Sequence, residues 1–189
     1  MLNLIRSRDP LTPHLVSEIS DEGIEVSIDS QLSTDDYVAI KVDNYYASLH
    51  QQNTPKSIDF IVVVDGSCSS YALYLLELKN VNCPRHLNLA DIKEKFSTTI
   101  NDFLGSRFSD IFENDRFKYK LIKLYLISDA YKAADHFPNH QTYLEFRKKI
   151  AKQDSLKVEL SLGDKLYKFR GRILKIEYDI PPNPVIKKP

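Results

Sequence analysis

Three residues with metal-binding or catalytic side chains lie in two neighbouring apolar segments: Asp59 in the first, and Glu77 and Lys79 at the end of the second. Two carboxylates that face each other repel, and a lysine in an apolar strand is costly to remove from water. A divalent cation between the carboxylates would remove this conflict. Mg²⁺ prefers carboxylate oxygens, and a bound metal activates water for attack on a phosphodiester. These residue types therefore predict a metal centre that cleaves phosphodiester bonds.

The two apolar segments predict an antiparallel hairpin. The segments are Ser57–Val64 and Tyr71–Lys79. The six residues between them are Asp-Gly-Ser-Cys-Ser-Ser, all turn formers or small residues. A turn centred on Cys68 places Asp59 opposite Glu77, with Cβ atoms roughly 4.5–5.5 Å apart. Lys79 points to the same face as Glu77, because the side-chain period of a strand is two residues.

The surrounding elements predict an α/β fold with a central mixed sheet flanked by helices. Both faces of the hairpin are apolar, which is typical of strands inside a sheet that is covered on both sides. Ser33–Asp36 resembles a helix start, and the apolar spacing that follows predicts a helix to about Leu49. The Val38–Val42 part of this segment also fits a strand. A long helix over 89–112 and a strand over 120–127 follow.

The C-terminal part predicts a helix and a second hairpin. The helix spans about Thr142–Lys152, and the hairpin strands are Leu156–Leu162 and Leu166–Ile176, with a turn at Gly163-Asp164. The proline-rich tail from Ile180 is expected to be extended. Residues 1–32 read irregularly. The length fits one domain spanning 1–189, with a core over about 34–129 and the hairpin and tail over 156–189.

Composition predicts a cytoplasmic protein without a membrane partner. No run of 18 apolar residues occurs, and the N-terminal residues lack a secretory apolar region. The two cysteines, Cys68 and Cys83, fit free thiols in a reducing compartment better than a disulfide. The net charge is zero, but residues 1–65 carry 4 Lys/Arg against 11 Asp/Glu, whereas residues 66–189 carry 22 against 15. Such asymmetry points to nucleic acid, although a mixture of solvated surface charges explains it equally well.

The order of these elements and motifs resembles the PD-(D/E)XK nuclease superfamily, the fold of many type II restriction endonucleases. The restriction-endonuclease-like core runs helix–strand–strand–strand–helix–strand. Ile58-Asp59 stands in place of the family's Pro-Asp, and Glu77-Leu78-Lys79 matches its (Glu/Asp)-X-Lys motif. The resemblance covers roughly residues 34–129. The tripeptide alone is weak, because Asp91-Ile92-Lys93 has the same pattern on the predicted long helix.

The resemblance implies a Mg²⁺ site, with Mn²⁺ as an alternative. Asp59, Glu77 and the backbone carbonyl of Leu78 would hold the metal, and Lys79 would orient the attacking water and stabilise negative charge. A further acid from the preceding helix is common in the family. Asp43 is the first candidate for this ligand and Glu18 the second, although a solvent-facing helix residue is the simpler interpretation of Asp43.

The implied substrate is double-stranded DNA, and the implied activity is that of a Mg²⁺-dependent endonuclease, as in type II restriction enzymes. One site per chain and two strands to cut would require a homodimer. Six basic residues are candidates for phosphate contacts, four of them on one face of the predicted C-terminal hairpin. These residues are Lys93, Lys95, Lys157, Lys168, Arg170 and Arg172. An ordinary solvated strand face explains the last four at least as well.

The alternative function is a non-catalytic interaction or DNA-binding module that retains the nuclease fold. The zero net charge and the acidic first third of the chain favour it. The two hypotheses differ in whether Glu77 and Lys79 support metal-dependent cleavage.

Overall fold

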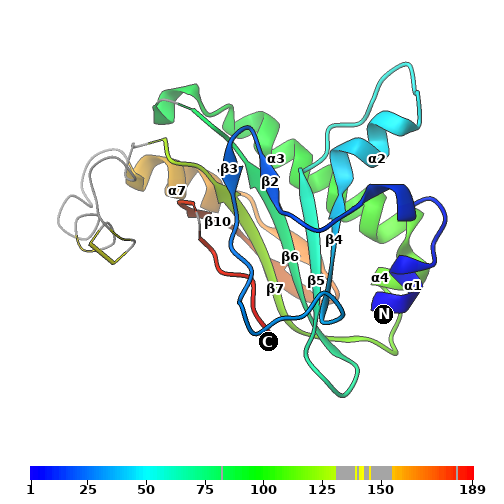
Figure 1. The fold of residues 1–189 in the computed structure, drawn as a ribbon. Coiled ribbons are helices and arrows are strands. Elements are labelled where there is room, and N and C mark those ends of the chain that lie inside the picture. Colours follow the sequence, from blue (N-terminus) through cyan, green and yellow to red (C-terminus); the bar gives the residue numbers. More distant parts are fainter. Residues whose placement is uncertain (82, 131–138, 140, 143–144, 146–154, 182) are drawn as a thin grey trace.

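A mixed six-stranded sheet forms the centre of the fold (Figure 1), in the order β1-β4-β5-β6-β7-β10. The computed structural model describes residues 1–81, 83–130, 139, 141–142, 145, 155–181 and 183–189. The strands of the sheet are β1 (Leu15–Val16), β4 (Tyr37–Lys41), β5 (Phe60–Asp65), β6 (Ser70–Leu78), β7 (Lys118–Ile127) and β10 (Ile176–Asp179). The pairs from β1 to β6 are antiparallel, whereas β7 is parallel to both β6 and β10.

β5 and β6 form the predicted hairpin. Their register runs from Phe60 opposite Leu76 to Asp65 opposite Tyr71. Continuing this register by one residue sets Asp59 opposite Glu77, as the sequence predicts. All nine residues of β6 are buried, because β5 and β7 flank this strand and both faces of the sheet are covered.

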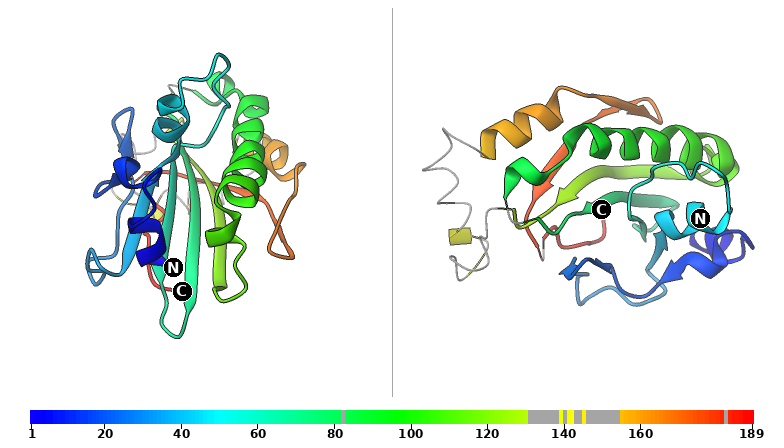
Figure 2. Two further views of the ribbon diagram at one scale, coloured as in Figure 1. Left: turned by 90° about the vertical axis from the view of Figure 1, so that its right-hand side faces the viewer. Right: turned by 90° about the horizontal axis from the view of Figure 1, so that it is seen from above.

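Helices cover one face of the sheet (Figure 2). They are α1 (Leu2–Arg6), α2 (Val42–Ser48), α3 (Leu89–Thr98), the π-helix η3 (Thr99–Arg107), α4 (Ser109–Phe112) and α7 (Ser155–Gly163), with short 3-10 turns η1 (Thr12–His14) and η2 (Pro84–His86). The opposite face is covered by the small hairpin of β2 (Ser20–Asp21) and β3 (Ile24–Glu25) and by the C-terminal tail, in which Ile186 is buried. The expected α/β architecture with a mixed sheet is confirmed. The cover of the second face by a hairpin and an extended tail differs from the expected helices.

The predicted helix from Ser33 to Leu49 is wrong in its first half. β4 occupies Tyr37–Lys41 and pairs with β5, and only Val42–Ser48 is helical. Ser33 and Asp36 form a turn instead of a helix start: both the backbone N–H and the hydroxyl of Ser33 donate to Asp36 Oδ2, at 2.8 and 2.9 Å. The strand alternative for Val38–Val42 was the better interpretation.

The long helix and the strand that follows it are confirmed, with one difference. Asn88 caps α3 by accepting a hydrogen bond from the Asp91 backbone N–H at 3.2 Å. The helix then continues as the π-helix η3, and the short α-helix α4 follows it. β7 begins two residues earlier than the predicted strand and ends at the predicted Ile127.

The predicted second hairpin is wrong in its first strand. Residues 155–163 form α7, which packs on α3 and buries Val158 and Leu162, four residues apart, while Leu160 is 64% exposed. The small hairpin that does form joins β8 (Tyr167–Phe169) to β9 (Arg172–Leu174). Its turn lies at residues 170–171 and not at 163–164.

The remaining predictions concern a helix near residue 142, membrane spans, the two cysteines and the C-terminal tail. The predicted helix Thr142–Lys152 lies largely outside the described residues. Within the described residues, no helix is long and apolar enough to cross a membrane. Cys68 and Cys83 are both free thiols. The described tail residues, 181 and 183–189, are not helical, and Ile186 forms a parallel bridge with Ile28.

Candidate metal centre

The candidate site lies at the edge of the sheet where β4 ends, β5 begins and β6 ends. Antiparallel pairing of β4 with β5 and of β5 with β6 brings these strand ends together. Asp59 immediately precedes β5, and Glu77 is the second-last residue of β6; their exposed fractions are 3% and 0%. The backbone N–H of Leu78 donates a hydrogen bond to Asp59 Oδ2 at 2.7 Å. The open end of the hairpin therefore holds two buried carboxylates next to each other.

Two ammonium groups contact one oxygen of Glu77. Lys95 Nζ, from α3, lies 2.6 Å from Glu77 Oε1, and Lys79 Nζ lies 3.3 Å from the same oxygen. Lys95 Nζ also lies 4.0 Å from Asp59 Oδ1. The other oxygen, Glu77 Oε2, is buried and has no hydrogen-bond partner among the described residues. A buried carboxylate oxygen without a partner is costly, so this atom marks a position for a proton or a cation.

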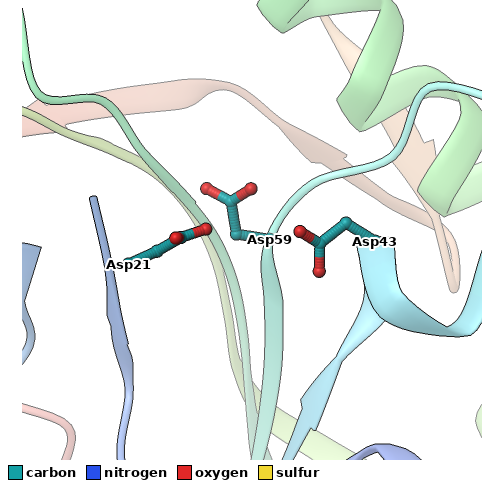
Figure 3. Close-up of side chains that lie close together, drawn as sticks. All are labelled: Asp21, Asp43 and Asp59. Carbon is teal, nitrogen blue, oxygen red and sulfur yellow. The ribbon is translucent and has the colours of Figure 1, made fainter. Parts of the chain in front are cut away.

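A second group of carboxylates adjoins the first through Asp59 (Figure 3). One oxygen each of Asp21, Asp43 and Asp59 lies within 4.8 Å of the others. Asp21 comes from β2 on one face of the sheet, and Asp43 comes from the first turn of α2 on the other. Lys41 Nζ lies 2.5 Å from Asp21 Oδ2 and 3.3 Å from Asp43 Oδ2. Carboxylate oxygens at this spacing suit a hard divalent cation, so these three residues could hold a metal ion.

Negative charge exceeds positive charge at this edge of the sheet. A fifth carboxylate, that of Glu22, lies 3.5 Å from Lys79 Nζ. Five carboxylates therefore share the site with three ammonium groups, which leaves a net charge of −2 when all of them are ionised. The carboxylates are Asp21, Glu22, Asp43, Asp59 and Glu77, and the ammonium groups are Lys41, Lys79 and Lys95. One divalent cation would balance this charge.

Burial opposes ionisation of the two central carboxyl groups. Burial and the neighbouring charge of Asp59 raise the pKa of Glu77 to about 7, against the opposing effect of Lys95 and Lys79. Burial also raises the pKa of Asp59, although the Leu78 N–H and Lys95 lower it. For Lys79, burial lowers the pKa, but the carboxylates of Glu77, Asp59 and Glu22 raise it overall. At neutral pH Glu77 is thus close to the midpoint of its titration, while Lys79 stays protonated.

The raised pKa of Glu77 predicts that the metal-free protein loses stability as the pH rises from about 4.5 to about 7. In the unfolded chain Glu77 loses its proton near pH 4.5, whereas in the folded protein it keeps the proton until about pH 7. In this range the folded state binds more protons, so the free energy of unfolding decreases with pH. The total decrease from Glu77 is about 3 kcal/mol. Urea unfolding in EDTA across this range would measure it.

His14 gives a slope of the opposite sign, because burial lowers its pKa. The quantity to follow is therefore the difference in unfolding free energy between wild type and Glu77→Gln at each pH. This difference should grow by about 3 kcal/mol, in favour of the variant, between pH 4.5 and pH 7. A difference that stays constant over the range would contradict the raised pKa.

The structure brings most of the predicted site residues together. Asp59, Glu77 and Lys79 adjoin one another, and Asp43 joins Asp59 from α2. The runner-up, Glu18, is exposed and is not one of the three carboxylates grouped at Asp59. The backbone of Leu78 lies at the site through its N–H, which holds Asp59.

The predicted basic face of the C-terminal hairpin does not form. Lys157 lies in α7, and Arg170 lies in the turn between β8 and β9, so these residues do not share a strand face with Lys168. Arg170 donates to the carbonyl of Phe117 at 3.0 Å and pairs with an aspartate, and Arg172 donates to backbone carbonyls of β7. Lys168 is exposed.

The other two basic candidates lie on α3. Lys93 pairs with Asp164 at 2.6 Å. Lys95 lies inside the metal centre, against Glu77, and not on an exposed face. The structure therefore associates Lys95 with the carboxylates, whereas Lys168 is exposed.

Sequence reasoning missed Asp21, Glu22 and Lys41. The signal for Lys41 is the same as that for Lys79: a lysine at the end of an apolar strand, here Val38–Lys41. The signal for the two acids is Glu22-Gly23 followed by alternating apolar residues, which indicates a tight hairpin turn. Neither signal predicts that these residues lie close to Asp59.

Comparison of the chain with protein-family models, curated proteins and solved structures gave no match. The function is therefore inferred from the residues of the metal centre.

Proposed function

We propose that this protein is a divalent-metal-dependent endonuclease of the PD-(D/E)XK type that hydrolyses phosphodiester bonds in double-stranded DNA. One observation carries the proposal. Glu77 is fully buried opposite Asp59 and has an oxygen without a protein partner among the described residues, at a site where carboxylates outnumber ammonium groups by five to three. A bound divalent cation would reduce the repulsion between the two buried carboxylates, supply a partner for the free oxygen of Glu77 and balance the excess negative charge.

The order and direction of the elements also support a PD-(D/E)XK nuclease. From residue 37 to residue 127 the main elements run β4, α2, β5, β6, α3, β7, so three antiparallel strands are followed by a helix and by a strand parallel to the third. The helix α1 precedes this series and is separated from it by β1, β2 and β3. Asp59 immediately precedes β5, the second strand of this series, and Glu77-Leu78 ends β6, the third, with Lys79 directly after it.

The residues of the centre have distinct roles in this proposal. Asp59, Glu77 and the Leu78 carbonyl would hold Mg²⁺ or Mn²⁺, with Asp43 as a further oxygen ligand. The bound metal would lower the pKa of a water molecule and shield the charge of the scissile phosphate. Lys79 carries its proton at neutral pH, because the nearby carboxylates raise its pKa. Its ammonium group therefore donates a hydrogen bond to developing negative charge and does not act as the base.

A restriction-type activity would add two requirements. Cutting both strands with one site per chain requires a homodimer, and recognition of a sequence requires base contacts in a groove. The homodimer and the base contacts are therefore proposed together with a restriction-type activity.

A second candidate function is a non-catalytic interaction module with the same fold. The observation that favours it is the engagement of basic residues within the protein: Lys93, Arg170 and Arg172 pair with side chains or carbonyls of this chain. Fewer free cations are then left on the described surface for contact with phosphates.

Cleavage of supercoiled plasmid with Mg²⁺ or Mn²⁺, against EDTA, tests the proposal. Wild type should nick or linearise the plasmid only with metal, and Asp59→Asn should reduce the rate at least about 100-fold, because a ligand of the activating metal is lost. Asp91→Asn is the matched control. Asp91 begins the second acid-X-Lys tripeptide, on α3, and pairs with Lys56 outside the centre.

The control should cut at the wild-type rate. Absence of metal-dependent cutting on supercoiled, linear and single-stranded DNA would refute the nuclease and favour the interaction module. Equal loss in Asp59→Asn and Asp91→Asn would show that the site is misplaced.

A further inference from the structure

The turn of the β2–β3 hairpin lies against the metal centre. Asp21 and Glu22, at this turn, each contact a lysine of the centre: Asp21 contacts Lys41 at 2.5 Å, and Glu22 contacts Lys79 at 3.5 Å. The hairpin belongs to the segment that covers the sheet face opposite the helices. Two acidic residues from a distant part of the sequence thus neutralise two lysines at the site.

Glu22 is held by a set of donors that suits a phosphate. Its Oε1 faces the Lys79 ammonium group, and its Oε2 accepts a hydrogen bond from the backbone N–H of Asn80 at 3.2 Å. A cation and a backbone N–H side by side form a common arrangement for binding phosphate oxygens. The Asn80 side chain fixes the turn by donating to the Glu22 carbonyl at 2.8 Å.

The backbone at Glu22 gives a second, independent observation. Glu22 and Gly23 have φ angles of +51° and +79°. Two-residue hairpin turns with positive φ at both central residues favour Asn, Asp or Gly at the first of them. A glutamate there is strained by comparison. Its contacts with Lys79 and Asn80 supply a reason for its presence, because a shorter side chain at the same backbone position has less reach.

The contact is of a kind that a ligand can displace. The side chain of Glu22 is 49% exposed, so its pair with Lys79 is screened by water and contributes little to stability. Glu77 also contacts Lys79 but is fully buried. Of the two acids, Glu22 is the one that can leave without exposing a buried charge.

We propose that Lys79 and the backbone N–H of Asn80 form a phosphate-binding site, and that Glu22 occupies this site until a phosphate of the nucleic acid displaces it. The inference rests on the proposed function for the identity of its ligand. The β2–β3 turn then acts as an internal competitor of DNA at the metal centre.

The test compares Glu22→Gln with Glu25→Gln. Both substitutions remove one negative charge from the same hairpin, and Glu25 is exposed. Binding of a fluorescent DNA duplex in EDTA should tighten roughly five-fold in Glu22→Gln, as expected for the loss of one competing surface ion pair. In Glu25→Gln it should change less than about two-fold, because only distant, screened charge is removed.

A local measurement separates this inference from the nuclease proposal. Titration with inorganic phosphate should shift the amide resonance of Asn80, at lower phosphate concentration in Glu22→Gln than in wild type or Glu25→Gln. If the Asn80 amide does not respond, or responds equally in all three proteins, the phosphate site is refuted even when the wild type cuts DNA. If the amide responds as expected but no DNA is cut, the phosphate site stands and the nuclease proposal fails.

Discussion

Glu77→Gln is expected to abolish metal-dependent cleavage and at the same time to stabilise the metal-free protein. Glutamine keeps the size of the side chain but removes the charge that a metal ligand needs, so the cleavage rate should fall at least about 100-fold. The same change removes a buried carboxylate whose ionisation is opposed by burial and by Asp59. At pH 8 in EDTA the free energy of unfolding should rise by about 1–3 kcal/mol. Plasmid cleavage and urea unfolding of one preparation measure both effects.

Glu94→Gln is the matched control for this substitution. Glu94 lies on α3, and its carboxylate is exposed and pairs with Lys56. The control should leave cleavage unchanged and alter stability by less than about 1 kcal/mol, because exposed ion pairs contribute little. If Glu77→Gln lost both activity and stability, the loss of cleavage would be a folding defect. If it kept its activity, the metal centre would have to be placed elsewhere.

Lys95→Met is expected to destabilise the metal-free protein by about 3 kcal/mol at neutral pH. The ammonium group of Lys95 is the closest cation to Glu77 and also approaches Asp59. Removing one partner of a buried ion pair leaves an uncompensated charge and typically costs 3–5 kcal/mol; here Lys79 remains and partly compensates. A divalent cation would replace the lost charge. Addition of Mg²⁺ should therefore raise the unfolding free energy more in Lys95→Met than in wild type.

Lys93→Met provides the comparison on the same helix. Lys93 pairs with the exposed Asp164, so its loss should cost less than about 1 kcal/mol, and Mg²⁺ should stabilise this variant no more than wild type. Equal destabilisation of the two variants would show that Lys95 does not balance the buried carboxylates. An equal response to Mg²⁺ in Lys95→Met and wild type would show that the cation does not bind where Lys95 lies.

The hairpin at the centre of the fold could be predicted because its local signals agree. Turn-forming residues around Cys68 separate two runs that are apolar on both faces, and the register they imply is the observed one. Asp59 and Glu77 meet across this short turn. Their proximity therefore depends only on strand pairing and turn length, and residues close together in the sequence indicate both.

The segments that were predicted wrongly have patterns that fit both a helix and a strand. In 156–162 the apolar residues alternate, which predicts a strand, yet Val158 and Leu162 also have the spacing of a helix. Packing against α3 decides for the helix and leaves Leu160 exposed. Val38–Lys41 forms a strand in spite of its helical spacing, because it pairs with β5. In both segments the partner that decides lies far away in the sequence.

The site was predictable only where strand pairing alone positions its residues. Asp59, Glu77 and Lys79 follow from the hairpin. Lys95 reaches Glu77 through the packing of α3 on the sheet, and Asp21 reaches Asp59 through the cover of the opposite face. These contacts depend on tertiary packing, which periodicity and turn signals do not describe.

All charged groups of the centre lie between residues 21 and 95, whereas β7 and β10, which complete the sheet, follow after residue 117. During synthesis the chain emerges from its N-terminus, so the carboxylates leave the ribosome well before the strand that covers the outer edge of β6. A parallel partner such as β7 can pair only after its long crossover is complete. Until then one edge of β6 is unpaired, and the burial that raises the pKa of Glu77 is incomplete. The burial that helps to raise the pKa of Glu77 is thus completed late in folding, by strands that carry none of the charged groups of the centre.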